Sequence, residues 1–302
     1  MSPHVLIAGG GIGGMAAALA LLRAGMDVDV YEQARALREV GAGVQISANG
    51  NRTLYALGLQ QAIEALAVET QGKEIRLWNT GQTWKLFDLG RVSVERYGYP
   101  YCTVWRPDLL AVLADAVRRI KPDAIHLGAV CTGFVERPDW QVESWMARGD
   151  PVAFARDFTG WHDDVQSMIR NIDEPYQWAL ASRPPLERWS IGRATLLGDA
   201  CHPTLPMLAQ GAVMALEDGY ILARCLRAFD SIDEALQRYE GARLDRTTRI
   251  VQGSAENAKR FHNKKLGDAA EAQRFVDTEW AKERVNTRYE WLFRYDVTTT
   301  PI

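Results

Sequence analysis

The sequence predicts an α/β fold with a parallel-sheet domain, an inserted mixed β-sheet region and a C-terminal helical tail. Three observations predict it. A strand, a glycine turn, a helix and a second strand follow one another over residues 4–31. A hairpin pattern at residues 74–89 interrupts the alternation of strands and helices. Residues 229–284 are mostly polar with amphipathic helical spacing, which predicts the helical tail.

The opening unit is the most sharply patterned part of the chain. Residues 4–8 have the composition of a short buried strand, and residues 13–24 form a helix rich in Ala and Leu that Gly25 ends as a C-cap. Residues 27–31 alternate with period two, as a strand does. Further helices are expected at residues 48–57, 107–119, 163–172 and 211–226, and further strands at residues 125–135, 177–181 and 194–197. Strands and helices in this order are typical of an α/β protein.

Composition excludes several classes of protein. The chain has 302 residues, of which 47% are hydrophobic and 24% are charged, as in ordinary globular proteins. Its formal net charge is −3, so the basic excess of a nucleic-acid-binding protein is missing. The four cysteines, Cys102, Cys131, Cys201 and Cys225, are far apart in the sequence. This spacing argues against a zinc site or a disulfide framework, so we expect no metal and a reducing, cytoplasmic location.

Residues 5–22 carry no charge over 18 positions, about the length of a membrane span. Five of these residues are glycines, and no Lys or Arg precedes them. We therefore expect a buried strand, a turn and a buried helix instead of a membrane or signal segment.

The glycine turn itself carries a nucleotide-binding pattern. Gly9, Gly11 and Gly14 form G-x-G-x-x-G between the first strand and the first helix, and Glu32 ends the second strand 18 positions after Gly14. Such a turn lets a pyrophosphate approach the backbone at a helix N-terminus, and the acid accepts hydrogen bonds from ribose hydroxyls. These residues fit NAD and FAD equally well.

A second motif separates the two cofactors. Residues 195–203 read TLLGDACHP, residues 203–219 continue as PTLPMLAQGAVMALEDG, and residues 105–110 read WRPDLL. Together with the glycine turn, these segments resemble the FAD-dependent aromatic hydroxylases, the class A flavoprotein monooxygenases. Within that family the chain is most similar to the salicylate and 3-hydroxybenzoate hydroxylases. The resemblance covers the N-terminal third and most of residues 183–219, with a weaker match in the C-terminal tail.

The resemblance implies a tightly but non-covalently bound FAD. Asp199 would hydrogen-bond its ribityl chain, Pro203 would lie beside the isoalloxazine, and the N–H groups of Gly211 and Ala212 would face the pyrimidine edge. A helix N-terminus there stabilises the negative charge of reduced flavin. Arg106 matches an arginine near the FAD phosphates and ribityl chain. The alternative for Arg106 is an ion pair with a nearby acid at the start of its helix.

The implied reaction is hydroxylation of a phenolic aromatic acid with dioxygen, through a flavin hydroperoxide. NADH or NADPH would bind transiently as co-substrate, because no second G-x-G-x-x-G is present. A homodimer is also expected. The Rossmann-like FAD-binding domain would comprise residues 1–73, 105–135 and 191–228. A substrate-region hairpin (74–104), a remnant of the substrate domain (136–190) and the helical region (229–302) would complete the chain.

The chain departs from the family pattern in its middle. The family has a D-G motif after the helix that begins near Arg106, whereas Asp-Gly occurs here only at Asp218-Gly219. A segment the size of a small domain is therefore expected to be missing near residue 134. Two alternatives stay open: an FAD-binding remnant without hydroxylase activity, or a flavin-dependent reductase or epoxidase of the same fold. No catalytic acid or base is assigned.

Other residues receive structural interpretations. His202 is expected to belong to the turn of the second motif, with a catalytic base as the alternative, and Cys201 is expected to pack tightly beside it. Tyr97, Tyr99 and Tyr101 are candidates for the lining of an aromatic pocket.

Overall fold

The computed structural model describes residues 3–37, 43–131, 148–176, 180 and 182–302, and these residues have the expected α/β order. The strands are β1 (His4–Ala8), β2 (Asp27–Glu32), β3 (Gly43–Ile46), β4 (Val68–Glu69), β5 (Gly72–Arg76), β6 (Thr83–Asp88), β7 (Cys102–Trp105), β8 (Ile125–Leu127), β9 (Ser190–Ile191) and β10 (Ala194–Thr195). The helices of the first half are α1 (Ile12–Arg23), α2 (Ala48–Ala56), α3 (Gln60–Leu66), α4 (Gly90–Tyr97) and α5 (Arg106–Ile120). Those of the second half are α6 (Pro151–Asp157), α7 (Asp163–Arg170), α8 (Gly211–Ala228), α9 (Ile232–Phe261), α10 (Ala269–Glu279) and α11 (Lys282–Phe293), with short 3₁₀ turns η1 (Gly198–Ala200), η2 (Pro206–Leu208) and η3 (Lys264–Gly267).

A parallel sheet of order β1-β2-β8 forms the nucleotide-binding half. Its strands point their apolar side chains, such as Val28 and Val30, into a core that they share with α1 and α5. Gly25, with a φ of +82°, ends α1 as the sequence predicted. The strands expected at residues 4–8 and 27–31 are thereby confirmed. Residues 5–22 form β1, the turn and α1, and no helix of the described residues is long and apolar enough to span a membrane.

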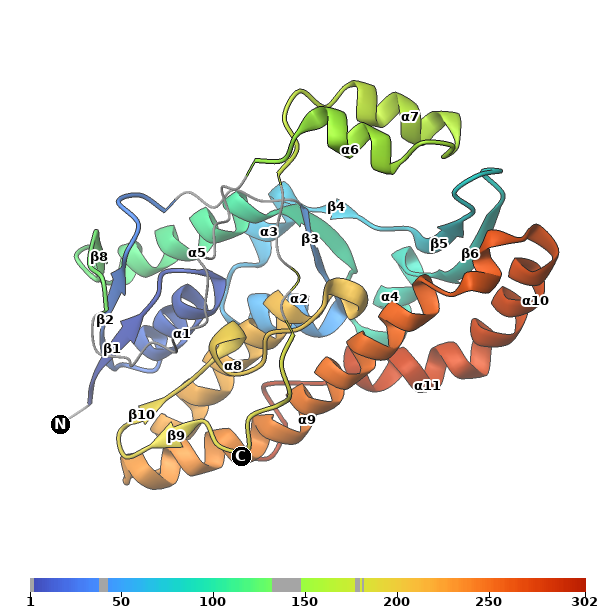
Figure 1. Cartoon of the computed structure of the whole chain (residues 1–302). Coiled ribbons are helices and arrows are strands. Elements are labelled where there is room, and N and C mark those ends of the chain that lie inside the picture. The colour runs from blue at the N-terminus through green and yellow to red at the C-terminus, as the bar shows by residue number, and fades with distance from the viewer. Residues whose placement is uncertain (1–2, 38–42, 132–147, 177–179, 181) are drawn as a thin grey trace.

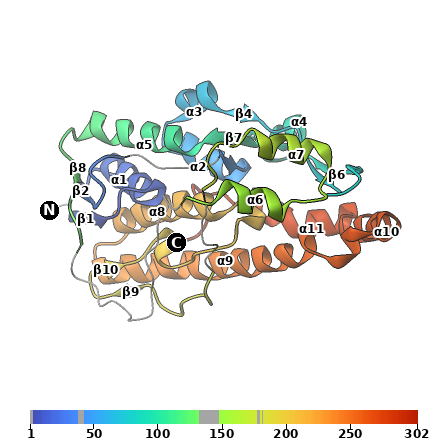
Figure 2. The ribbon, with the colours of Figure 1, turned by 45° about the horizontal axis from the view of Figure 1, so that its top comes forward.

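Helix α1 packs closely against α8 because both present small residues at the contact. A Cβ on Gly219 would lie 2.6 Å from the backbone nitrogen of Ala17. Helix α8 in turn lies beside the long helix α9 in both ribbon views (Figure 1 and Figure 2). Through α8, helix α1 near the N-terminus is therefore connected to helix α9 in the C-terminal half.

The hairpin expected at residues 74–89 is confirmed as the antiparallel pair β5–β6, with Gly81 at a φ of +71° in its turn. A second small sheet has the order β3-β7-β4. Helices α6 and α7 lie at the top of Figure 1, near the hairpin turn, where Arg76 pairs with Asp164 at 2.7 Å and Trp78 packs on Trp161. The α6–α7 segment therefore contacts the hairpin near the turn between β5 and β6.

Two expected strands are shorter than their patterns. Of the pattern at residues 125–135, only Ile125–Leu127 form a strand, β8, among the described residues up to 131. Only residues 194–195 of the apolar run at 194–197 are paired, as β10, antiparallel to β9. The chain then turns at Gly198, whose φ is +62°, into η1. Residue 134, near which a segment is expected to be missing, and most of the strand expected at residues 177–181 lie outside the described residues.

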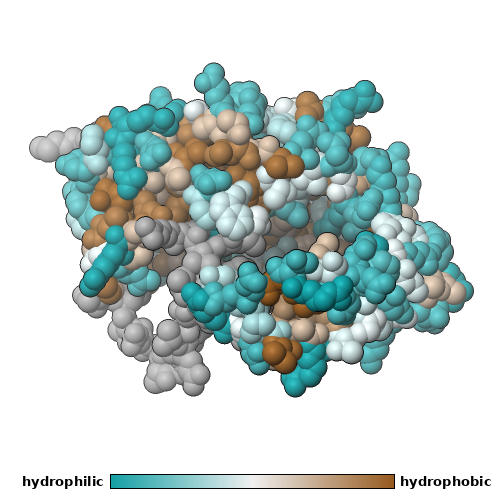
Figure 3. All heavy atoms as spheres, turned by 90° about the horizontal axis from the view of Figure 1, so that it is seen from above, coloured by the Kyte–Doolittle hydropathy of each residue, from teal (hydrophilic) through white to brown (hydrophobic). Residues whose placement is uncertain are grey.

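The helical tail is confirmed, and its last helix ends at residue 293, within the expected region 229–302. Its helices α10 and α11 pack against the hairpin around a second core that includes Trp280, Tyr289 and Phe293. In Figure 3, hydrophobic side chains (brown) gather in the upper left part of the face shown, and the surface is hollowed near the centre of the view. Because α10 and α11 share this core with the hairpin, the tail covers one side of the hairpin.

Candidate active site

The turn between β1 and α1 requires glycine at two positions. Gly9 has a φ of +108°, which L side chains rarely adopt. A Cβ on Gly14 would lie only 2.0 Å from the carbonyl oxygen of Gly9. Gly11 is the N-cap of α1, and no side chain caps the helix there. The first N–H groups of α1 are thus available to a phosphate, which helix N-termini bind.

Glu32 closes this turn from the end of β2. Its Oε2 accepts a hydrogen bond from the N–H of Gly10 at 2.6 Å, and its Oε1 accepts one from the N–H of Ala34 at 2.8 Å. A carboxylate has about four acceptor positions, so both oxygens can still accept from ribose hydroxyls. The glycine motif and Glu32 are therefore neighbours, as the sequence predicted, and Glu32 has the additional role of holding the turn.

The second motif also folds into a tight turn. The N–H of Gly198 donates to Asp218 Oδ2 at 2.9 Å, which ties η1 to α8. Asp199 is exposed on this turn, and Pro203 is half-buried in the loop that follows. Asp199 is thus free to face a ligand, while the backbone beside it is held from within.

Cys201 and His202 lie on the inner side of the same turn. Cys201 Sγ donates to the carbonyl of Gly198 at 3.3 Å, and burial raises the pKa of its thiol. His202 is 2% exposed, with Nε2 only 2.6 Å from Asp218 Oδ2. Both side chains support the turn from the core, as expected for structural residues.

The N-terminus of α8 lies next to this loop. Its N-cap, Gln210, does not cap the helix with its side chain. That side chain is fully buried, donates to Ser47 Oγ at 3.0 Å and accepts from Asn49 Nδ2 at 3.1 Å. The first N–H groups of α8, at Gly211 and Ala212, are therefore available to a partially negative group.

A buried ionic network lies behind α8, and the sequence analysis missed it. Arg243 of α9 is fully buried, with Nε 2.8 Å from Asp218 Oδ1 and Nη2 2.8 Å from Glu217 Oε2. Arg246 donates to both oxygens of Glu217 at 2.9 and 2.8 Å. Two adjacent acids on the apolar helix α8, and two arginines three positions apart on α9, were the available signal.

The network determines how Asp218 is charged. Burial alone would raise the pKa of Asp218, but the interactions with His202 and with the positive charge of Arg243 outweigh burial and lower that pKa to about 2. Asp218 is therefore ionised at neutral pH. Because it also accepts the N–H of Gly198, the network fixes the turn that carries Asp199.

Arg106 begins α5 directly after β7 and is half-buried. The residue before it, Trp105, pairs with Gly43 of β3. Its expected position near the phosphates of FAD stays a prediction.

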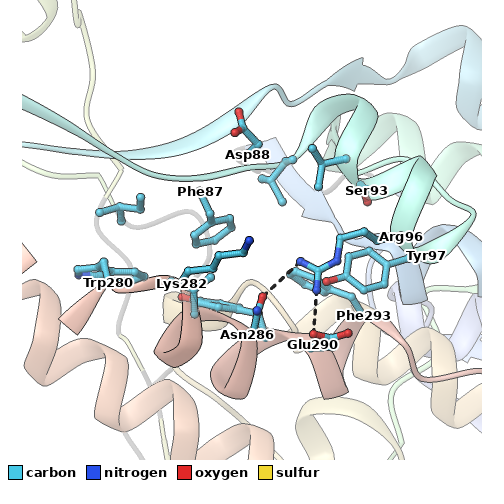
Figure 4. A pocket seen from close by; sticks show the side chains of 15 residues that line it. Phe87, Asp88, Ser93, Arg96, Tyr97, Trp280, Lys282, Asn286, Glu290 and Phe293 are labelled. Atoms are coloured by element: carbon cyan, nitrogen blue, oxygen red, sulfur yellow. Dashed lines mark hydrogen bonds and ion pairs between the residues drawn. The ribbon is translucent and has the colours of Figure 1, made fainter. Parts of the chain in front are cut away.

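Two cavities lie between the hairpin and the C-terminal helices. The larger, about 290 Å³, is enclosed by β6, α4 and α11. Figure 4 shows Arg96 reaching across it, where it donates to Asn286 Oδ1 at 3.2 Å and to Glu290 Oε2 at 2.9 Å. Glu290 therefore balances the positive charge of Arg96 within the protein.

The smaller cavity, about 50 Å³, lies closer to the start of α8. Its walls include Gln45 of β3, Tyr101 of β7 and Leu208 of η2. Phe87, Leu89, Tyr289 and Phe293 line both cavities. Of the tyrosines expected in an aromatic pocket, Tyr101 lines the smaller cavity and Tyr97 the larger, whereas Tyr99 packs against Tyr55.

The two motifs meet at the N-terminus of α1, and their arrangement fits FAD. A Cβ on Gly13 would lie 2.9 Å from Leu197 Cδ1 and 3.1 Å from the Cβ of Ala215. One end of the site thus offers an uncapped helix N-terminus and an acid for the adenosine and phosphates. The other end offers an exposed acid and a second uncapped helix N-terminus for the ribityl chain and the flavin ring.

Comparisons with known proteins agree with this geometry. The model of the FAD binding domain family matches residues 3–139 and 156–254. The chain is 30% identical to the 3-amino-4-hydroxybenzoate 2-monooxygenase PtnB3 of Streptomyces platensis and 30% identical to the 3-hydroxybenzoate 6-hydroxylase of Polaromonas naphthalenivorans, each over 97% of this chain and 96% of the relative. A solved salicylate hydroxylase substrate complex has the same fold, with a TM-score of 0.73 at 18% identity over 99% of this chain and 97% of that one.

The alignments also bear on the length of the chain. They extend over 389 and 390 positions, more than the 302 residues present here, so these relatives contain residues that have no counterpart in this chain. The matches nevertheless include both motifs and the helical tail. The chain therefore belongs to the FAD-binding family of class A flavoprotein monooxygenases, which are FAD-dependent aromatic hydroxylases.

Proposed function

We propose that this protein hydroxylates a phenolic aromatic acid of the salicylate or 3-hydroxybenzoate type, with dioxygen and either NADH or NADPH. The observation that carries the proposal is the position of the smaller cavity. Gln45 and Leu208, which lie beside the start of α8, form one wall, and aromatic side chains of the hairpin and α11 form the rest. An aromatic substrate that reaches into this cavity would adjoin the flavin end of the site.

The residues that hold FAD are part of the same proposal. Gly9, Gly11 and Gly14 admit the pyrophosphate to the α1 N-terminus, Glu32 accepts from the ribose, and Arg106 lies near the phosphates. At the other end, Asp199 accepts from the ribityl hydroxyls and Pro203 lies beside the ring. Gly211 and Ala212 direct their N–H groups at its pyrimidine edge.

FAD in this site would supply the electron transfer and the activation of dioxygen. The protein's own part is positioning, charge stabilisation and the exclusion of water. The α8 N-terminus stabilises negative charge on the ring that its N–H groups face. Leu208, Phe87 and Phe293 surround the substrate with apolar surface, which limits the access of water to the reacting atoms.

A second candidate is an FAD-binding protein that couples NADH oxidation poorly to hydroxylation. The alignments favour it, because the relatives contain residues that this chain lacks. A substrate site with an incomplete wall would admit water, and misplacement of the substrate by about 1 Å can reduce the rate about 100-fold.

One experiment distinguishes the two candidates. Purified, FAD-loaded protein is supplied with NADH or NADPH and a panel of hydroxybenzoates, and hydroxylated product and hydrogen peroxide are both measured. The proposed function predicts product in proportion to the NADH consumed for at least one acid. Peroxide as the main product supports the second candidate, and failure to bind FAD contradicts both.

The cofactor contacts have their own test. Glu32→Ala is expected to weaken FAD binding by about 1–3 kcal/mol, because ribose hydroxyls lose a charged acceptor. Gly211→Val is expected to displace the ring. Unchanged FAD affinity in either variant would remove that residue from the proposed site.

We also propose a cytoplasmic location and a homodimer. The location is supported by four cysteines that are all free thiols, three of them buried. Size-exclusion chromatography with light scattering tests the dimer.

A further inference from the structure

Lys73 is a cation in apolar surroundings near the proposed substrate site. It is the second residue of β5 and is half-buried. Its Nζ lies 4.8 Å from the ring centroid of Phe261 and 5.9 Å from that of Tyr289. Throughout the described parts of the chain, no carboxylate lies within 4.0 Å of this Nζ. Lys85 on the neighbouring strand, by contrast, pairs with Asp88.

The smaller cavity gives Lys73 access to a ligand. Lys73 is the one charged residue among the described residues that line it. The nearby polar groups are largely occupied: the Tyr101 hydroxyl donates to Gln45 Oε1 at 2.8 Å, and the Thr70 hydroxyl lies 3.2 Å from that of Thr103. The ammonium group is therefore the strongest available donor in a cavity otherwise lined mainly by apolar and aromatic side chains.

The cavity also relates Lys73 to the cofactor site. Leu208, three residues before the start of α8, and Gln45 form the wall on that side. Gln45 is two residues before Ser47, which is hydrogen-bonded to the N-cap residue Gln210. A ligand held by Lys73 would thus extend toward the start of α8. With about 50 Å³, the cavity has room for a few water molecules, and so for a carboxylate group.

We infer that Lys73 binds the carboxylate of the aromatic substrate and thereby selects acids over neutral phenols, an inference that rests on the proposed function. The aromatic rings beside Lys73 favour its cation through their faces. They do not neutralise it, so an anion adds a charge-assisted hydrogen bond that no described side chain supplies. The ring of the acid would then contact the aromatic walls of the cavity.

The electrostatics of the site support this role. Burial, together with the smaller effect of the positive charge of Arg288 on α11, lowers the pKa of Lys73 to about 8. The other titratable groups on its walls, Tyr101 and Tyr289, have pKa values raised by burial and stay neutral at pH 7. A bound carboxylate would restore the charged form of Lys73, so acid binding should weaken as the pH rises above about 8.

The test compares acid and amide ligands on FAD-loaded protein. The probes are 3-hydroxybenzoate and 3-hydroxybenzamide, which differ only in the carboxylate, and their dissociation constants are measured by equilibrium dialysis and by perturbation of the flavin spectrum at pH 7. Lys73→Met is expected to weaken acid binding about 10- to 100-fold and to leave amide binding within twofold. Lys73→Arg should retain most of the acid affinity. Lys85→Met is the matched control, with no effect on either ligand.

A second measurement needs no variant. Benzoate and benzamide have no phenol to titrate, so wild-type protein is titrated with each between pH 6 and pH 10. Benzoate affinity is expected to fall by up to tenfold per pH unit above pH 8, whereas benzamide affinity stays constant.

The outcomes separate this inference from the proposed function. If 3-hydroxybenzoate binds Lys73→Met as tightly as wild type, or if Lys73→Met loses acid and amide alike, the inference is wrong while the proposed function stands. A flat pH profile for benzoate also overturns it. If no acid of the panel binds the FAD-loaded wild type or is hydroxylated by it, the proposed function itself fails and the inference fails with it.

Discussion

Replacement of Arg243 by methionine should strongly destabilise the protein. The guanidinium is fully buried and lies 2.8 Å from both Asp218 Oδ1 and Glu217 Oε2. It also donates to the hydroxyl of Tyr295 at 3.1 Å. Methionine is shorter and has no charge, but its apolar chain replaces the stem of Arg243, so the variant keeps part of the packing and removes the cation.

The magnitude follows from what the two acids retain. Removing one partner of a buried ion pair costs about 3–5 kcal/mol, because the remaining charge stays buried without compensation. Here Asp218 keeps His202 and Glu217 keeps Arg246, each in direct contact. We therefore expect a loss of about 3 kcal/mol in the free energy of unfolding, at the low end of that range.

Urea unfolding followed by tryptophan fluorescence, at one saturating FAD concentration, measures this loss as a shift of the midpoint. Arg238→Met is the matched control on the same helix, since Arg238 is exposed and lies 3.6 Å from Glu234. Its loss should be below about 0.5 kcal/mol. A loss below about 1 kcal/mol for Arg243→Met would refute the reasoning, since the two buried acids would then not depend on Arg243 for compensation of their charge.

Three further predictions concern the turn, the helix contact and pH. Gly14→Ala should abolish FAD binding, because its Cβ would lie 2.0 Å from the Gly9 oxygen; an unchanged flavin content after purification would contradict this. Gly219→Ala should lower the melting temperature measured by calorimetry, because its Cβ would lie 2.6 Å from the Ala17 nitrogen and would force α1 and α8 apart; an unchanged value would show that they can separate without cost. The pKa of Asp218 is lowered to about 2 from an ordinary 3.8, so its contribution is complete above about pH 4 and is lost as the pH falls toward 2. Acid titration of stability should therefore show a steeper loss between pH 4 and pH 2 in wild type than in Asp218→Asn, and parallel curves would contradict the assignment.

Local sequence patterns predicted the cofactor-binding half well, because each pattern acts within a few residues. The strands before and after α1, the turn glycines and the C-cap at Gly25 all have the conformations that their sequence indicated. The hairpin and the helical tail were recognised by the same means. The strand expected at residues 194–197 was overestimated, because the turn at Gly198 ends its pairing early.

The sequence by itself determined the fold class, the family and the cofactor, since these depend on short motifs whose backbone geometry admits few residue types. Tertiary structure alone decided which distant side chains meet. Lys73 comes from β5 and its aromatic neighbours from α9 and α11, and Asp218 meets Arg243 only because α8 and α9 pack side by side. Such contacts arise from the burial of helix faces against one another, and no local preference encodes which faces will pair. The charge state of Asp218 and the unpaired cation of Lys73 follow from that packing.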